Sequence, residues 1–319
     1  MCRSAQSRKR WAARGRNVLL AYGGGSLKRT GLYDRLRGWL HECGKHVVDF
    51  GGIRPNPTYA KVQEGARLVR EQGIDFILAV GGGSVIDCCK IVSAQARTDE
   101  DIWDMMYEAH RLPTGFVPTE AVVTASGTGA EQNNGAVITH TAKRLKQPLV
   151  GAYHSFAILD SDLTKTLPMK QVVSGAFDTL SHCMETYMGR PQGDNLSDEI
   201  NEAVMRSVIK NLRALIANPD DDFARGELMW DSALYRHLLA EGRALRTCVK
   251  PILICSPSFP VILSAGLPFP PAVSQTQDGF LQKTGRKPTA CKGKFVSLQA
   301  VCRHTPQASG AQTPHIKHI

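Results

Sequence analysis

The chain has 319 residues, enough for two ordinary domains, and 42% of its residues are hydrophobic, enough for a buried core. No run approaches the roughly 20 apolar residues of a membrane helix, and the basic N-terminus lacks the apolar stretch of a secretory signal, so we expect a cytoplasmic protein without a membrane segment. The net charge is +10, but residues 1–16 hold six basic and no acidic side chains and residues 251–319 hold seven basic and one acidic, which leaves 26 basic and 28 acidic in between. Because the excess positive charge lies at the two ends, we expect no nucleic-acid partner.

Strand, glycine turn and helix alternate in the first half of the chain. Short apolar runs typical of buried strands occur at 18–22, 47–50 and 76–80. Helical periodicity occurs at 31–43, 59–72 and 84–94. This alternation predicts a parallel sheet with helices on both faces, which forms an α/β dinucleotide-binding domain over residues 17–165.

The pattern changes after Pro168 and again near residue 247. Helical periodicity at 171–189 and 198–217 predicts a partial helical domain over residues 166–246. Residues 251–319 contain nine of the 17 prolines and no sustained period, so 247–319 is expected to be a poorly ordered basic tail. The basic residues 1–16 are likewise expected to be irregular.

Two Gly-Gly-Gly-Ser turns, Gly23–Ser26 and Gly81–Ser84, follow predicted strands. Such a turn lets backbone N–H groups approach a phosphate at a helix N-terminus, although a single one could be a tight turn that binds nothing. Both turns lie at the carboxyl ends of strands, where ligands of parallel sheets bind. Lys28 and Arg29 beside the first turn suit a 2′-phosphate and favour NADP, unless they are only the solvated start of a helix.

Two further segments carry polar groups suited to ligands. Thr124–Gly135 is dense in hydroxyl and amide side chains, which can bond a phosphate, ribose or base but which alone indicate only a polar loop. Asp178 and His182 lie four residues apart in a predicted helix and therefore face the same way. That spacing suits two ligands of one divalent metal, although such a pair is more often a simple hydrogen bond.

In this order, the four elements resemble the iron-containing alcohol dehydrogenase family, in its NADP-dependent butanol dehydrogenase and aldehyde reductase branch, over roughly Asn17–Leu234. The resemblance implies an α/β fold class: an N-terminal parallel-sheet nucleotide-binding domain followed by a partial all-helical metal-binding domain. It implies reversible hydride transfer between NADP(H), or NAD(H), and a small alcohol or aldehyde. It also implies a divalent Fe²⁺ or Zn²⁺, which a histidine and a carboxylate suit equally, and a homodimer.

The resemblance assigns roles to individual residues. The cofactor-binding residues that it implies are Gly24, Ser26, Gly82, Gly83, Ser84, Asp87, Thr124, Thr128, Asn133, Gly135 and Lys146. The first two match the turn around the 2′-phosphate, and the next three match the turn around the pyrophosphate. Asp87 matches the residue that orients the nicotinamide, and the last five match the cofactor-lining loop and a cofactor-contacting lysine. The first two metal ligands correspond to Asp178 and His182.

The resemblance fails at the rest of the metal site. It implies two more histidine ligands, near residues 256–257 and 266, but no histidine occurs between His237 and His304. A catalytic metal usually has at least three protein ligands and an open position, so two would hold it weakly. We therefore hypothesise that the sequence after about residue 235 was replaced, by a frame shift or an aberrant exon, with a similar disruption at the front. The alternatives are a non-catalytic nucleotide-binding remnant and a relative of glycerol dehydrogenase, which shares the fold.

Overall fold

The computed structural model describes residues 2–188, 196–238, 252–255 and 262–263. By its contacts the chain divides into a unit of residues 1–267 and a second unit of 268–319, which lies outside the described residues.

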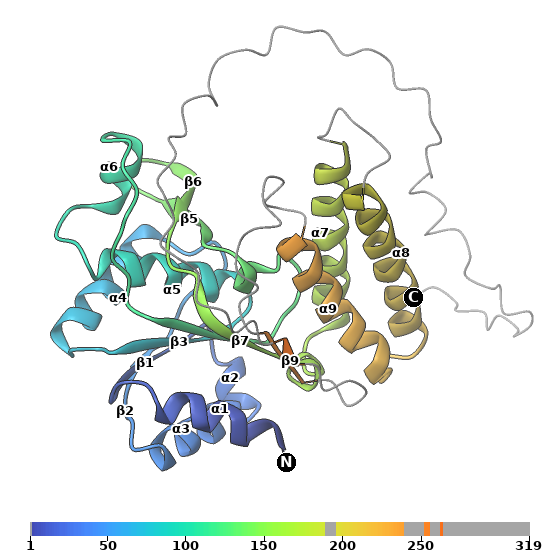
Figure 1. The fold of residues 1–319 in the computed structure, drawn as a ribbon, viewed down its shortest axis with the longest axis horizontal. Helices are drawn as coiled ribbons and strands as arrows, with labels where there is room; N and C mark the ends of the chain where they lie inside the picture. The colour runs from blue at the N-terminus through green and yellow to red at the C-terminus, as the bar shows by residue number, and fades with distance from the viewer. Residues whose placement is uncertain (1, 189–195, 239–251, 256–261, 264–319) are drawn as a thin grey trace, which may run out of the picture. The chain divides into compact units, whose positions relative to one another are not determined.

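A sheet with strand order β2-β1-β3-β4-β7-β8-β9 forms the centre of this unit (Figure 1). Its strands are β1 (Asn17–Tyr22), β2 (His46–Phe50), β3 (Phe76–Gly81), β4 (Thr119–Val123), β7 (His154–Asp160), β8 (Ile252–Cys255) and β9 (Ile262–Leu263). All neighbouring strands are parallel except β8 and β9. The remaining strands, β5 (Gly135–His140) and β6 (Leu145–Val150), form a separate antiparallel hairpin.

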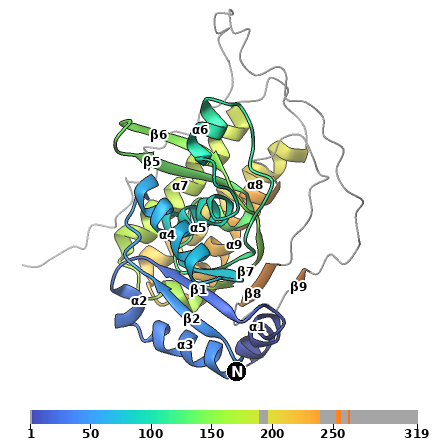
Figure 2. The same cartoon turned by 90° about the vertical axis from the view of Figure 1, so that its left-hand side faces the viewer.

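Helices cover both faces of the sheet, as the sequence predicted (Figures 1 and 2). On one face lie α4 (Tyr59–Glu71) and α5 (Gly83–Gln95), and on the other lie α1 (Cys2–Ala12), the short α2 (Ser26–Arg29) and α3 (Leu32–Glu42). Alternate residues of β1 enter different cores, with Leu19 packing on the α4 and α5 side and Leu20 on the α3 side. This is the period of two that a strand buried on both faces requires.

The first helix corrects the prediction of an irregular N-terminus. Trp11 is fully buried in the core on the α3 side, and Arg14 Nε donates to Glu120 Oε1 at 2.8 Å. Arg8 pairs with Glu42 at 2.7 Å, and the Arg10 guanidinium lies 5.0 Å from the centre of the Phe156 ring. The basic side chains of this segment therefore hold a helix onto the sheet rather than forming a solvated tail.

Three helices follow β7 along the chain: α7 (Met169–Met188), α8 (Leu196–Ala217) and α9 (Asp222–Leu238). They share a core of their own, and α9 also places Met229 and Ala233 in the core beside α5. Short segments complete the chain: α6 (Ile102–Tyr107) and the 3-10 turns η1 (Ala130–Gln132) and η2 (Ser161–Thr164). An α/β sheet followed by helices confirms the predicted fold class, whereas the domain limits at 165 and 246 stay a prediction.

The segment after residue 247 differs in part from its prediction. The strand β8 pairs parallel with β7, from Ala157 beside Ile252 to Asp160 beside Cys255, and β9 pairs with β8. The apolar run Ile252–Cys255 is long enough to extend the sheet, which explains the strand in a sequence where none was expected. The rest of the predicted tail lies outside the described residues. Among the described helices, none is long and apolar enough to cross a membrane.

Candidate cofactor and metal site

The order of the strands places the two glycine turns side by side. The chain passes from β1 to β2 on one side and then crosses to β3 on the other side of β1. Tyr22, the last residue of β1, lies beside Val80 of β3, so both turns begin at the same edge of the sheet. A reversal of strand order of this kind forms the crevice in which doubly wound sheets bind their ligands.

The second turn leads directly into α5, where Gly82 is the N-cap in an extended conformation. A Cβ on Gly82 would lie 3.2 Å from Ala125 Cβ, and one on Gly83 would lie 3.0 Å from Thr128 Oγ1. The glycines therefore let the turn pack against the Thr124–Gly135 loop. The first N–H groups of a helix have no acceptor within it, so the start of α5 at Gly82, Gly83 and Ser84 has the chemistry that would suit a phosphate.

The first turn is more open. Gly24 and Ser26 are exposed, and a Cβ on Gly24 would meet nothing within 4 Å. Lys28 Nζ lies 4.9 Å from the centre of the Tyr33 ring and 5.6 Å from that of Tyr22. These contacts keep an ammonium group close to the turn, where a phosphate would bind.

The Thr124–Gly135 loop is attached to the same edge of the sheet. Thr124 N donates to Gly81 O at 3.0 Å, which connects the end of β4 to the end of β3. Asn133 is buried, and its Nδ2 donates to Gly129 O at 3.4 Å across the left-handed turn at Gly129. The two glycine turns lie at one edge of the sheet, as the sequence predicted, and the structure adds the Thr124–Gly135 loop to that edge.

A residue that the sequence reasoning missed, Lys90, connects three of the predicted ones. Its ammonium is fully buried and donates to Gly135 O at 2.7 Å and to Asn133 Oδ1 at 3.2 Å. It also pairs with Asp87 Oδ1 at 3.4 Å, while Asp87 Oδ2 accepts from Val137 N at 3.0 Å. The available signal was a lysine three residues after Asp87 in a helix, flanked by the apolar residues Cys88, Cys89, Ile91 and Val92.

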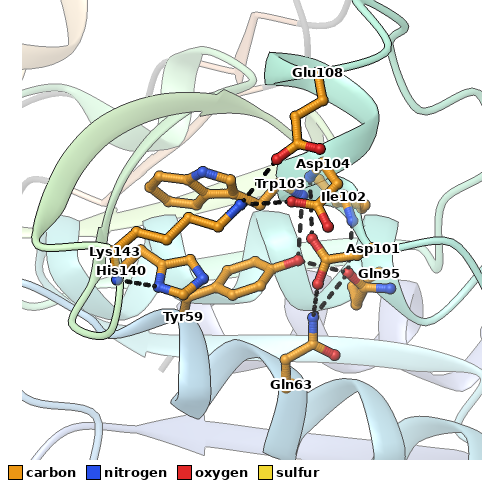
Figure 3. Close-up of polar contacts among 10 residues, drawn as sticks. All are labelled: Tyr59, Gln63, Gln95, Asp101, Ile102, Trp103, Asp104, Glu108, His140 and Lys143. Carbon is orange, nitrogen blue, oxygen red and sulfur yellow. Dashed lines mark hydrogen bonds and ion pairs between the residues drawn. The ribbon is translucent and has the colours of Figure 1, made fainter.

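Lys146 lies on the hairpin, away from these buried contacts. Its exposed ammonium donates to Asn56 Oδ1 at 2.8 Å, in the segment that follows β2. Figure 3 shows how the tip of the hairpin is held: the His140 ring stacks on Tyr59 of α4, and Lys143 pairs with Asp104 of α6 at 2.7 Å. The hairpin that carries Lys146 is therefore fixed to two helices of the domain.

The two predicted metal ligands, Asp178 and His182, lie close together on α7. Asp178 Oδ1 lies 3.6 Å from His182 Nε2, and the His182 ring stacks on Tyr235 of α9 with the centroids 5.6 Å apart. Two ligands of one tetrahedral ion, each about 2.0–2.2 Å from it, lie about 3.4 Å from each other, so this pair fits a shared ion. In the part of the chain that the structure describes, no group of three or more His, Cys, Asp or Glu side chains could hold a metal ion. The positions 256–257 and 266 lie outside that part.

The helix α7, which carries Asp178 and His182, contacts the Thr124–Gly135 loop directly. Thr179 Oγ1 donates to Gly127 O at 2.8 Å, and a Cβ on Gly175 would overlap the carbonyl oxygen of Ser126. A Cβ on Gly127 would in turn lie 3.3 Å from Asp178 Oδ2. These close approaches place the Asp178 carboxylate against the loop predicted to line the cofactor.

Comparison with known proteins identifies the class to which this fold and site belong. The family model "Iron-containing alcohol dehydrogenase" matches residues 3–161, and "Fe-containing alcohol dehydrogenase family, C-terminal" matches residues 172–243. Together they cover well over half of the chain, which therefore belongs to the iron-containing alcohol dehydrogenase family. The first match begins at residue 3 and so includes most of the basic N-terminal segment, while the disruption predicted there stays a prediction.

Individual relatives agree with this assignment. The chain is 38% identical over 224 residues to a probable NADH-dependent butanol dehydrogenase 1 of Bacillus subtilis, covering 69% of this chain and 57% of that protein. It is 37% identical over 221 residues to the NADPH-dependent aldehyde reductase YqhD of Escherichia coli, covering 67% and 56%. The crystal structure of NADH-dependent butanol dehydrogenase A from Thermotoga maritima matches with a TM-score of 0.68 and 35% identity, over 72% of this chain and 58% of that one. The chain thus spans less than two thirds of the length of these relatives.

Proposed function

We propose that this chain binds NADP(H) in the crevice between the ends of β1 and β3. The 2′-phosphate lies at Gly24 and Ser26, and the pyrophosphate lies at Gly82, Gly83 and Ser84. The observation that carries this proposal is the adjacency of the two glycine turns at the reversal of strand order. Thr124, Thr128, Asn133, Gly135 and Lys146 line the rest of the cofactor, and Asp87 orients the nicotinamide.

The preference for NADP over NAD rests on the first turn. The turn presents glycine, serine and the ammonium of Lys28, and its sequence contains no carboxylate that would repel a 2′-phosphate. The relatives include both NADH-dependent and NADPH-dependent enzymes by name, so the family alone does not decide between the two cofactors.

The reaction that we propose for this fold is reversible hydride transfer between the cofactor and a small alcohol or aldehyde, in a homodimer. Asp178 and His182 would hold a divalent iron or zinc ion, which as a Lewis acid polarises the substrate oxygen. The contacts of Gly127 with Thr179 and Asp178 keep this pair beside the cofactor loop. A metal held by these two ligands alone binds weakly, so we expect slow turnover.

A second candidate is a nucleotide-binding protein without catalysis. It is favoured by the sequence, which has no histidine between His237 and His304, where the family places two further ligands. The family models also end at residue 243. In this case the cofactor binds as above and no hydride is transferred.

One assay separates the two candidates. The purified chain is supplied with NADPH, a short-chain aldehyde and either Fe²⁺ or Zn²⁺, and the absorbance of the reduced nicotinamide is followed. Slow, metal-dependent oxidation that His182→Asn abolishes supports the enzyme, whereas cofactor binding without turnover supports the second candidate. Turnover as fast as that of the full-length relatives contradicts the incomplete metal site.

A further inference from the structure

A buried ammonium group, that of Lys90, contacts three residues of the proposed cofactor site. Lys90 is completely buried, although a lysine charge inside a protein is costly unless acceptors replace its water. It donates to the carbonyl oxygen of Gly135 and to the side-chain oxygen of Asn133, and it pairs with the Asp87 carboxylate. The acceptors come from α5 itself, from the loop after η1 and from the start of β5.

These contacts fix the direction of two side chains proposed to bind the cofactor. Asp87 is held at both oxygens, by Lys90 Nζ at 3.4 Å and by Val137 N at 3.0 Å. Asn133 is held at both ends of its amide, by Lys90 at 3.2 Å and by Gly129 O at 3.4 Å. Hydrogen bonds that involve a charged group are shorter and stronger than neutral ones, so the ammonium restrains both side chains.

The main chain of Lys90 adds a second attachment. Its carbonyl oxygen accepts from Ala152 N at 3.3 Å, and a Cβ on Gly151 would lie 2.5 Å from the same oxygen. Lys90 thereby contacts Gly135 at the start of the β5–β6 hairpin, and Gly151 and Ala152 directly after the hairpin ends. The close approach leaves no room for a side chain at residue 151, so the end of the hairpin packs directly on the main chain of α5.

We propose that Lys90 is a positioning residue for the nicotinamide half of the cofactor. It acts through Asp87 and Asn133, which it holds against α5, and not through contact with the cofactor. The inference rests on the proposed function, because it takes Asp87 to serve the nicotinamide. In this proposal the adenosine half binds at the first glycine turn, which makes none of these contacts. Loss of the Lys90 ammonium should therefore affect the binding of the nicotinamide half and leave that of the adenosine half unchanged.

The test compares Lys90→Met, which keeps the length of the side chain and removes its charge, with the parent chain. Dissociation constants are measured for NADPH and for 2′,5′-ADP, which carries only the adenosine half. Because loss of the ammonium releases the side chains of Asp87 and Asn133, we expect Lys90→Met to weaken the binding of NADPH by about tenfold or more. We expect it to change the affinity for 2′,5′-ADP by less than about twofold.

The matched control is Lys45→Met. Lys45 is also buried and donates to the carbonyl oxygens of Arg14 at 2.7 Å and Ala12 at 3.4 Å, but it lies at the N-terminal helix. We expect this variant to lose thermal stability while it binds both ligands as the parent does. If Lys90→Met does not fold, Lys90→Arg, which keeps the charge but misplaces the donors, is expected to show the same difference between the ligands.

The outcomes are distinct. Unchanged NADPH affinity, or an equal loss for NADPH and 2′,5′-ADP, in the variant that folds overturns the positioning role. A parent chain that binds neither ligand instead overturns the proposed function itself.

Discussion

The hydroxyl of Thr179 donates a hydrogen bond of 2.8 Å to the carbonyl oxygen of Gly127. Thr179 follows Asp178, one member of the predicted metal pair, and Gly127 lies in the loop predicted to line the cofactor. This bond joins α7 to the loop that follows β4. The pair Gly175 and Ser126 makes the same junction through a close backbone approach.

The first prediction concerns that approach. Gly175→Ala introduces a Cβ that would overlap Ser126 O, so we expect a loss of about 1–3 kcal/mol in stability despite the better helix propensity of alanine. The control is Gly38→Ala in α3, where a Cβ meets nothing within 4 Å, and there we expect a gain of about 0.5–1 kcal/mol. Thermal or urea unfolding measures both, and a stabilised Gly175→Ala variant would show that the junction is loose.

The second prediction concerns the choice of cofactor. The position of Gly24 has room for a side chain, so Gly24→Asp is expected to fold normally. Its carboxylate repels a 2′-phosphate and offers an acceptor to a ribose hydroxyl, as in NAD-selective sites. We expect NADPH affinity to fall by about tenfold or more and NADH affinity to hold or rise. Equal losses for both cofactors would place the 2′-phosphate elsewhere.

The third prediction concerns the N-terminal helix. Burial raises the pKa of the Glu120 carboxyl, and the adjacent Arg14 opposes that shift. Arg14→Ala leaves the buried carboxylate without its guanidinium partner, so we expect a loss of about 2–4 kcal/mol at neutral pH. For the exposed Arg16, substitution by alanine is expected to change stability by less than about 0.5 kcal/mol. Similar unfolding midpoints for the two variants would contradict a structural role for the pair of Arg14 and Glu120.

The fourth prediction concerns pH. Burial in α9 raises the pKa of Asp231 to about 7, although the nearby Ser207 and Asn211 oppose the shift. Because the unfolded carboxyl loses its proton at lower pH than the folded one, this group lowers stability as pH rises from about 4 to about 7. One pKa unit corresponds to about 1.4 kcal/mol, so Asp231→Asn is expected to be more stable than the parent at pH 8, by up to about 4 kcal/mol.

Unfolding of both chains measured at pH 4 and pH 8 provides the check. The advantage of Asp231→Asn is expected to shrink at pH 4, where the parent carboxyl is largely protonated in the folded state. An advantage that is independent of pH would indicate a packing effect instead.

The sequence predicted those features that depend on neighbours along the chain. The apolar run at 18–22 and the glycines after it fixed β1 and its turn, and Asp178 and His182 were placed together by helical spacing alone. The helix at Cys2–Ala12 was missed because its anchors are distant, with Arg14 held by Glu120, 106 residues further along. Lys90 was missed for the same reason, since its acceptors Asn133 and Gly135 come together with it only in the folded chain.

A titration with NADPH tests most directly whether the two adjacent glycine turns hold a dinucleotide. The parent chain is compared with Gly82→Val, whose side chain would enter the narrow space between the turn and Ala125. We predict saturable binding by the parent and a loss of about tenfold or more in the variant, with both chains folded by circular dichroism. A parent chain that shows no binding, or a variant that binds as tightly as the parent, would contradict the account.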